Sequence, residues 1–319
     1  MIRFVLWAAL LLAAAGLACA QTYPNKPVRI IFPFAAGGAG DIIARTYGQK
    51  FAEKFGHGWV LDNRGGAGST LGTDIAAKAA PDGYTLLQGS MTFAVSAATY
   101  TKLPYDAVRD FSPITPVGMA VSLLAVTPSL PANNLKELIA FAKSKPGQLT
   151  FASGGGTGST GHLSGELFKR MAKIDMLHVP YKGTGVALPD LIAGRVHLIF
   201  EPIASMMPNV RAGRMRALGV TTAKRSAAAP EIPSLAEQGL EGFDVATWYG
   251  YLAPAGTPRP IIDTLYRALV EFVADAEVRK SMAAIGVEPM TLTPKEFAAR
   301  IKSDIARWSE VARAASVSL

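Results

Sequence analysis

The sequence has little cysteine and little charge. Among 319 residues there is one cysteine, Cys19, and 18% are charged, against about 25% in an average domain. A single cysteine excludes a disulfide scaffold, and low charge combined with 50% hydrophobic residues excludes a disordered chain. Sustained heptads are also lacking, which argues against a coiled coil. The chain is therefore a well-buried globular protein, long enough for about two domains.

A marked apolar run lies at the N-terminus. Arg3 is followed by apolar residues 4–17 and then by Ala18-Cys19-Ala20, the charged start, hydrophobic middle and small-residue end of a secretory signal. A membrane anchor is one alternative, but the run is shorter than the ~20 residues that a spanning helix needs. Lipid modification of Cys19 is another, disfavoured because Gly16 stands where a lipoprotein signal usually has Leu. We predict a signal peptide at residues 1–20 and an exported, cysteine-free mature protein.

Positive charge prevails, with Lys and Arg outnumbering Asp and Glu by 32 to 24. The densest basic stretch contains Arg211, Arg214, Arg216, Lys224 and Arg225. It has no interleaved aromatic residues and no nucleic-acid-binding fingerprint, so we interpret it as a solvated face. We expect no nucleic-acid partner. The excess of positive charge instead favours attraction of small anions.

Strands, glycine-containing loops and helices alternate along the mature chain, which is typical of an α/β protein with parallel strands and crossover helices. The first block predicts strands at 28–32, 59–61 and 84–87, and helices at 42–55 and around 71–79. Asp41 and Ser69 are predicted as the N-caps of those helices. The second block predicts strands at 122–126, 176–179 and 196–200, and helices at 134–143, 162–171 and 186–193.

Three further helices are indicated near the C-terminus. One begins at Ser234, and amphipathic helices follow at 258–274 and 293–314. Thr293 and Glu296 flank a proline at the first helical position, which is a strong N-terminal signal. We divide the chain into lobe I (21–121 and 245–319) and lobe II (122–244), because no polar linker separates the blocks. The lobes are expected to be joined by strands crossing near 121–126 and 243–252.

Four loops rich in Gly, Ser and Thr follow predicted strands, at 35–40, 88–90, 152–161 and 180–185. In a parallel α/β sheet such loops face the ligand crevice. Glycine lets backbone N–H groups converge on a ligand, and the helix start behind each loop adds partial positive charge. The pattern predicts a cleft for a carboxylate or phosphate that needs no Lys or Arg.

Signatures of catalysis and cofactor binding are weak. Residues 156–161 match G-x-G-x-x-G, but the acidic residue expected at the end of the next strand is missing, since Asp175 precedes that strand. There is no P-loop and no G-x-S-x-G elbow. His57, His162, His178 and His197 do not have metal-site spacing. We predict no catalytic residue, metal or cofactor.

An exported enzyme or sensor using Asp41, His162 and Glu201 is the alternative function. Asp41 is better explained as a helix cap, and Glu201 as a polar pocket wall or a contact between lobes. Tyr181 and Lys182 are candidate ligand contacts from the opposite lobe, although an exposed turn explains Lys182 about equally well.

Five segments together resemble one known family. They are YPNKPVRII (23–31), PFAAGGAGD (33–41), PDGYTLL (81–87), HVPYKG (178–183) and WYGYLAPAGTP (248–258). In this order they resemble the solute receptors of tripartite tricarboxylate transporters, also called Bug-type receptors, and the match extends through essentially the whole mature chain.

The resemblance implies a type II-like periplasmic binding protein with two α/β lobes, mostly parallel sheets, flanking helices and a ligand cleft between the lobes. Such a monomeric receptor would bind a small carboxylate through backbone N–H groups, Ser/Thr hydroxyls and water, and deliver it to membrane transporter subunits. The implied ligand-binding residues are Phe34, Ala36, Gly37, Gly38, Asp41, Gly89, Ser90, Ser153, Gly154, Thr157, Gly158, Ser159, Tyr181, Lys182 and Glu201.

The sequence departs from the family pattern at two of these places. Ala39-Gly40 stands where Pro or Gly followed by Thr is common, which removes a hydroxyl donor. Glu201 stands where Asp is frequent, which moves a carboxylate about one methylene further into the cleft. The ligand therefore stays open among tricarboxylates, dicarboxylates, acidic amino acids and aromatic acids.

Overall fold

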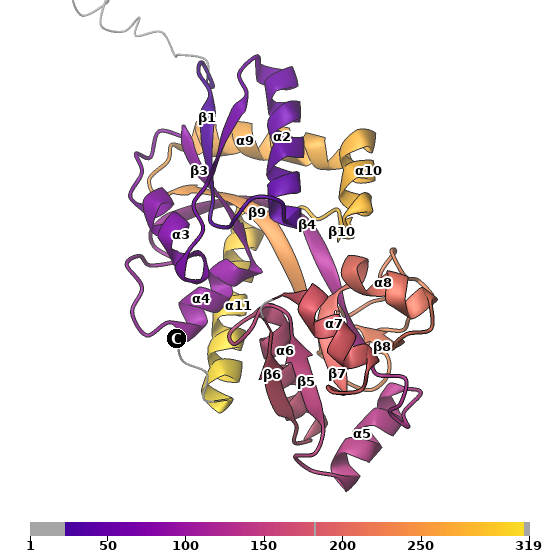
Figure 1. Cartoon of the computed structure of the whole chain (residues 1–319). Coiled ribbons are helices and arrows are strands. Elements are labelled where there is room, and N and C mark those ends of the chain that lie inside the picture. Colours follow the sequence, from indigo (N-terminus) through magenta and orange to yellow (C-terminus); the bar gives the residue numbers. More distant parts are fainter. Residues whose placement is uncertain (1–22, 182, 316–319) are drawn as a thin grey trace, which may run out of the picture.

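The computed structural model describes residues 23–181 and 183–315 (Figure 1). The predicted signal peptide and Lys182 lie outside the described residues. The strands are β1 (Val28–Phe32), β2 (Trp59–Asn63), β3 (Thr85–Ser90), β4 (Phe111–Val126), β5 (Thr150–Ser153), β6 (Leu177–Pro180), β7 (Leu198–Pro202), β8 (Arg216–Val220), β9 (Ala246–Pro254) and β10 (Val287–Glu288). The helices are α2 (Ala39–Phe55), the short 3₁₀ helix η1 (Ala67–Ser69), α3 (Thr70–Ala77), α4 (Met91–Thr99), α5 (Leu135–Ser144), α6 (Thr160–Ala172), α7 (Thr184–Ile192), α8 (Ile203–Arg211), α9 (Arg259–Ala274), α10 (Ala276–Ala284) and α11 (Pro294–Ala314).

One curled sheet runs through both lobes, in the order β2-β1-β3-β9-β4-β7-β5-β6. Its outer pairings are parallel, between β1 and both β2 and β3, and between β5 and both β6 and β7. Its central pairings, which involve β9 and β4, are antiparallel. Strand β4 pairs with β9 up to Val121 and with β7 from Ser122 onward. Figure 1 shows β4 and β9 crossing between the lobes, whose bounds stay a prediction.

Alternating side chains of the lobe I strands supply two hydrophobic layers, because successive residues of a strand point to opposite faces. Val28 and Ile30 pack in a cluster with α2, α9 and α10. Ile31 belongs to the cluster on the other face, which includes residues of α3, α4 and α11. Lobe I therefore has helices on both faces of its sheet.

Lobe II repeats this arrangement. Phe151 and Phe200 pack with α5 and α6 in the cluster that also contains α11 residues. Ala152 and Ile199 point the other way and pack with α7 and α8. Helix α11 thus contributes to a core shared by both lobes, and Figure 1 shows it running beside the crossing strands.

These features confirm the predicted α/β class with parallel units and flanking helices. The capping box at Thr293 and Glu296 is present, and Asn134 caps α5. None of the helices in the described residues is long and apolar enough to cross a membrane.

Two predicted helix starts were wrong, and a third was right in place only. Gly38 is the N-cap of α2, and Asp41 lies within its first turn, because the helix starts earlier than its apolar pattern indicates. Ser69 is the N-cap residue of α3, as predicted, but with its left-handed backbone (φ 78°) its side chain makes no capping hydrogen bond. Ser234 begins only a turn: its hydroxyl accepts a hydrogen bond from the N–H of Glu237 (3.0 Å), and no helix follows.

Candidate functional site

A cavity of about 510 Å³ lies between the lobes, next to the crossing strands. Lobe I contributes Phe34, Gly68, Thr92, Val95, Ser96, Thr99, Tyr100 and Thr247 to its wall, and lobe II contributes Ser122, Gly155, residues 157–161, Phe200, Glu201 and Pro202. Ser122 lies on β4 and Thr247 on β9. Both crossing strands therefore form part of the wall.

Helix starts from both lobes reach this cavity. Ser90 caps α4, whose second residue Thr92 lines the wall. Ser159 caps α6, and both Ser159 and the first helical residue, Thr160, line the wall from the other lobe. The first N–H groups of a helix lack partners within the helix and carry partial positive charge, so they attract anions. Of the described residues that form the wall, none is Lys or Arg.

Helix α4 presents a row of hydroxyl groups to the cavity. Thr92, Ser96 and Thr99 are spaced four and three residues apart, which places them on one helix face. The Ser96 hydroxyl donates to the carbonyl of Gly68 (2.9 Å), and that of Thr99 donates to the carbonyl of Val95 (2.8 Å). This row was not predicted, although the spacing of hydroxyl residues within 91–99 was a usable signal.

Glu201, at the end of β7, is the one acidic residue among the described residues of the wall. Its Oε1 accepts the backbone N–H of Gly154 (2.7 Å), and its Oε2 accepts the hydroxyl of Thr184 (2.6 Å). Burial raises the pKa of the Glu201 carboxyl, and the two hydrogen bonds partly oppose that rise. Both partners belong to lobe II, so these bonds make Glu201 a fixed pocket wall.

The predicted residues of the loop between β5 and α6 divide into two sets. Thr157, Gly158 and Ser159 line the cavity. Ser153 and Gly154 lie beneath it, buried, and bond to His178 and Glu201.

Most of the other predicted residues lie off the cavity wall. Phe34 lines it, but Ala36, Gly37 and Gly38 are exposed. Gly89 and Ser90 are buried at the end of β3, directly before α4. The Tyr181 hydroxyl donates to Asp190 (2.7 Å), and burial raises the pKa of Tyr181 to about 12. Lys182 lies outside the described residues.

Asp41 is buried, and its hydrogen-bond partners belong to its own lobe. Its carboxylate accepts hydrogen bonds from the Arg45 side chain (3.0 and 3.2 Å), the Asn63 amide (3.2 Å) and the Gly37 N–H (3.2 Å). The hydrogen bond from Arg45 is the main reason that the pKa of Asp41 is lowered. Asp41 therefore holds the loop before α2 in place.

The residues of the alternative enzyme hypothesis do not meet at the cavity. Of Asp41, His162 and Glu201, only Glu201 forms part of its wall. Across the described residues, no group of three or more His, Cys, Asp and Glu side chains could hold a metal ion. The geometry provides hydrogen-bond donors for an anion rather than an acid, a base and a nucleophile in contact.

Comparisons with known proteins agree with this chemistry. The profile of the family described as tripartite tricarboxylate transporter family receptor matches residues 43–317. Protein BugT of Bordetella pertussis is 36% identical over 318 residues, covering 98% of this chain and 97% of BugT.

Solved structures resemble the chain over similar lengths. An R. palustris protein solved with adipate has 35% identity and a TM-score of 0.77, covering 93% of this chain and 99% of that one. MatC from Rhodopseudomonas palustris, with bound malate, has 32% identity and a TM-score of 0.73, covering 91% of this chain and 99% of MatC.

Proposed function

This chain belongs to the tripartite tricarboxylate transporter receptor family, and from that premise we propose that it is a periplasmic receptor for a small organic carboxylate. The receptor presents its ligand to the membrane subunits of a tripartite transporter. It reaches the periplasm through the signal peptide predicted at residues 1–20, and it acts as a monomer.

The observation that carries this proposal is the chemistry of the cavity wall. Hydroxyl groups and the starts of α4 and α6 approach the same space from the two lobes, without Lys or Arg among the described wall residues. The hydroxyl hydrogens of Ser96 and Thr99 bond to carbonyls, so on α4 the Thr92 hydroxyl is the one proposed to donate to the ligand. Neutral donors of this kind replace water around a carboxylate, and the helix ends add their field. The two relatives solved with adipate and malate carry dicarboxylates, which favours a dicarboxylate here.

Closure of the lobes around the ligand is part of the proposal. The wall combines residues of both lobes, and the lobes are connected by β4 and β9. A ligand that contacts α4 and α6 together stabilises the arrangement in which both helix starts face it. Binding should therefore reduce the radius of gyration in small-angle scattering.

A ligand screen on the mature protein tests the proposal. Malate, adipate, citrate, glutamate and benzoate, each added separately, cover the classes left open by the sequence. A ligand at ~100 times its dissociation constant adds about 2.7 kcal/mol to the free energy of unfolding, so thermal unfolding detects it. Calorimetry then gives the Kd. No shift with any of the carboxylates would contradict the proposal, and conversion of the bound acid to a product would favour the enzyme alternative.

Paired threonine variants locate the site. Thr92→Val removes a hydroxyl from the cavity wall and should weaken binding about tenfold, the worth of one hydrogen bond to a charged group. Thr101→Val changes an exposed threonine just beyond α4 and should leave the Kd within about twofold. Equal effects of the two variants would place the ligand elsewhere.

A further inference from the structure

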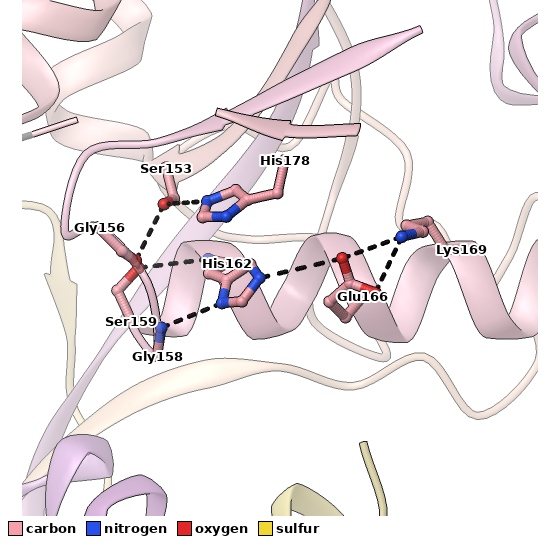
Figure 2. A network of polar contacts seen from close by, with 8 residues as sticks. All are labelled: Ser153, Gly156, Gly158, Ser159, His162, Glu166, Lys169 and His178. Atoms are coloured by element: carbon pink, nitrogen blue, oxygen red, sulfur yellow. Dashed lines mark hydrogen bonds and ion pairs between the residues drawn. The ribbon is translucent and has the colours of Figure 1, made fainter. Parts of the chain in front are cut away.

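Two histidines from different elements stack directly beneath the loop that joins β5 to α6. His162 lies in the first turn of α6 and His178 on β6, with ring centroids 3.8 Å apart and ring planes 22° apart. Phe151 packs beside both rings. His162 is buried and His178 is half-buried. Figure 2 shows the pair and its polar partners.

Hydrogen bonds assign one proton position to each ring. The backbone N–H of Gly158 donates to Nδ1 of His162 (3.0 Å). That nitrogen therefore carries no proton, and the neutral ring holds its proton on Nε2, 3.9 Å from Oε1 of Glu166. The Ser153 hydroxyl donates to the carbonyl of Gly156 (3.0 Å), so its oxygen accepts from Nε2 of His178 (2.7 Å). His162 is thus neutral, and both rings carry a proton on Nε2.

These bonds fix the shape of a segment that lines the cavity. The backbone is left-handed at Gly156 (φ 74°) and at Gly158 (φ 79°). The carbonyl of Gly156 also accepts the hydroxyl of Ser159 (2.7 Å), so the segment is tied at both ends. Thr157, Gly158 and Ser159 form part of the wall. The histidines themselves do not reach it.

We propose that His162 and His178 are positioning residues: as a neutral stacked pair they hold residues 153–159 in the ligand-binding shape, and protonation of either ring releases that shape. This inference rests on the proposed function, because it assigns a role to the wall of the same cavity. A proton on Nδ1 of His162 replaces the acceptor of the Gly158 N–H with a second donor. A charged His178 in turn places a cation against its stacked neighbour.

Burial is the main factor that favours the neutral state of both rings. Burial, with a smaller contribution from Lys169, lowers the pKa of His162 to about 4. Burial, followed by His162 and Lys169, lowers the pKa of His178 to about 4. Glu166 lies near His162, but it is also paired with Lys169 at 3.1 Å. Because the folded-state pKa values are lowered, the pair contributes stability above the ordinary histidine pKa, and this contribution is lost as pH falls toward 4.

The first test uses the ligand-free protein. Nitrogen NMR of the imidazoles should show both rings neutral, with the proton on Nε2, at about pH 6. Charged rings or the opposite proton position would overturn the proposal. His162→Asn keeps an acceptor near the place of Nδ1 but cannot become charged, whereas His162→Leu removes the acceptor. Hydrogen exchange of the Gly158 amide should accelerate at least about tenfold in His162→Leu and stay within about threefold in His162→Asn.

The second test measures affinity for the tightest carboxylate found in the screen. His162→Leu should weaken binding about tenfold at neutral pH, and His162→Asn by less than about threefold. Between about pH 7 and about pH 3.5, the Kd of the wild type should rise more steeply than that of His162→Asn, because only the wild type protonates at this position. Titration of the ligand and of Glu201 changes the Kd of both proteins equally. The difference between the wild type and His162→Asn therefore reports the titration of His162.

Control variants separate this role from a general loss of folding. His57→Asn, which changes a histidine between α2 and β2, should match the wild type in exchange and affinity. If His162→Leu fails to fold, His178→Gln serves as a second variant. It keeps a donor to Ser153, cannot become charged, and should resemble His162→Asn in exchange and affinity. Parallel pH profiles of the wild type and His162→Asn would overturn the inference. If the wild type binds no carboxylate, the proposed function fails, while the tautomer and exchange measurements still decide the state of the pair.

Discussion

Oε1 of Glu201 accepts a 2.7 Å hydrogen bond from the backbone N–H of Gly154, which ties the end of β7 to the loop that follows β5. The other carboxylate oxygen accepts the hydroxyl of Thr184, the first residue of α7. One side chain thus connects three segments around the cavity. A buried amide left without an acceptor costs about 1–3 kcal/mol, so these contacts have a measurable effect on folding.

Substitution of Glu201 separates the role of its hydrogen bonds from that of its charge. Glu201→Ala leaves the Gly154 amide without its acceptor and should lower the free energy of unfolding by about 1–3 kcal/mol. Glu201→Gln keeps a carbonyl oxygen and should stay within about 1 kcal/mol of the wild type. Urea unfolding at a series of pH values measures both. Equal losses in the two variants would contradict the assigned role of the Gly154 bond.

The pH dependence of the Glu201 variants has a defined sign. Burial raises the folded-state pKa above 4.5, so the neutral carboxyl stabilises the fold at low pH. That contribution is lost as pH rises through the raised pKa. Glu201→Gln stays neutral, and its stability relative to the wild type should therefore increase as pH rises through this range. A constant difference between the two proteins would contradict the raised pKa.

Asp41→Asn should reduce stability without reducing affinity. The substitution removes the ion pair with Arg45 and turns an amide NH2 toward two of the four donors that the carboxylate accepts, which should cost about 1–3 kcal/mol. Because the folded-state pKa of Asp41 is lowered below 3.8, its contribution is present above that value and is lost as pH falls through the lowered pKa. Urea unfolding should show the two proteins converging in acid. The Kd should change less than about threefold, and a larger loss would place Asp41 in contact with the ligand.

The order of strands, loops and helices could be predicted from the sequence because each unit is a local pattern. A short β-branched run identifies β1, and the Thr293–Glu296 capping box marks the start of α11. The loop between β5 and α6 was predicted as part of the site because several glycines and hydroxyl residues fall between a strand and a helix.

The central part of the sheet could not be predicted in this way. Strand β9 pairs with β3 and β4, which lie more than a hundred residues earlier in the chain, and no local pattern specifies such partners. The wall residues Ser122 and Thr247 depend on that pairing. Helix α4 was not predicted because it is short and mostly apolar. Its row of hydroxyl residues was therefore not predicted either. The loop before α2 was predicted at the site, but there only Phe34 reaches the cavity.

Two acidic residues at matched spacings test how burial changes the worth of an ion pair. Asp304 pairs with Arg300 (3.0 Å), is almost fully buried, and accepts the indole N–H of Trp248 (3.0 Å). Asp263 pairs with Arg259 (2.9 Å), also four residues away, at the surface. Asp304→Ala should lower the free energy of unfolding by about 2–4 kcal/mol, since it leaves a half-buried guanidinium and a buried indole without a partner. Asp263→Ala should cost less than about 0.5 kcal/mol. Similar losses in urea unfolding would contradict this assignment.

Two helical glycines should respond in opposite directions to the same substitution. A Cβ at Gly165 in α6 would lie 2.1 Å from the ring of Phe151, whereas a Cβ at Gly185 in α7 would meet nothing within 4 Å. Alanine favours a helix by about 1 kcal/mol over glycine, so Gly185→Ala should stabilise the protein by up to that amount. Gly165→Ala should instead destabilise it by about 1–3 kcal/mol, because the core around Phe151 has to shift.

The glycine pair also tests the histidine network, since Phe151 packs against His162 and His178. Displacement of the Phe151 ring in Gly165→Ala should alter the imidazole NMR signals and weaken carboxylate binding, whereas Gly185→Ala should change neither. The two variants are compared by urea unfolding, imidazole NMR and calorimetry. If Gly165→Ala gained stability and left both the imidazole NMR signals and the Kd unchanged, the close packing of α6 against β5 would be wrong. The proposed support of the cavity wall by this packing would then be wrong as well.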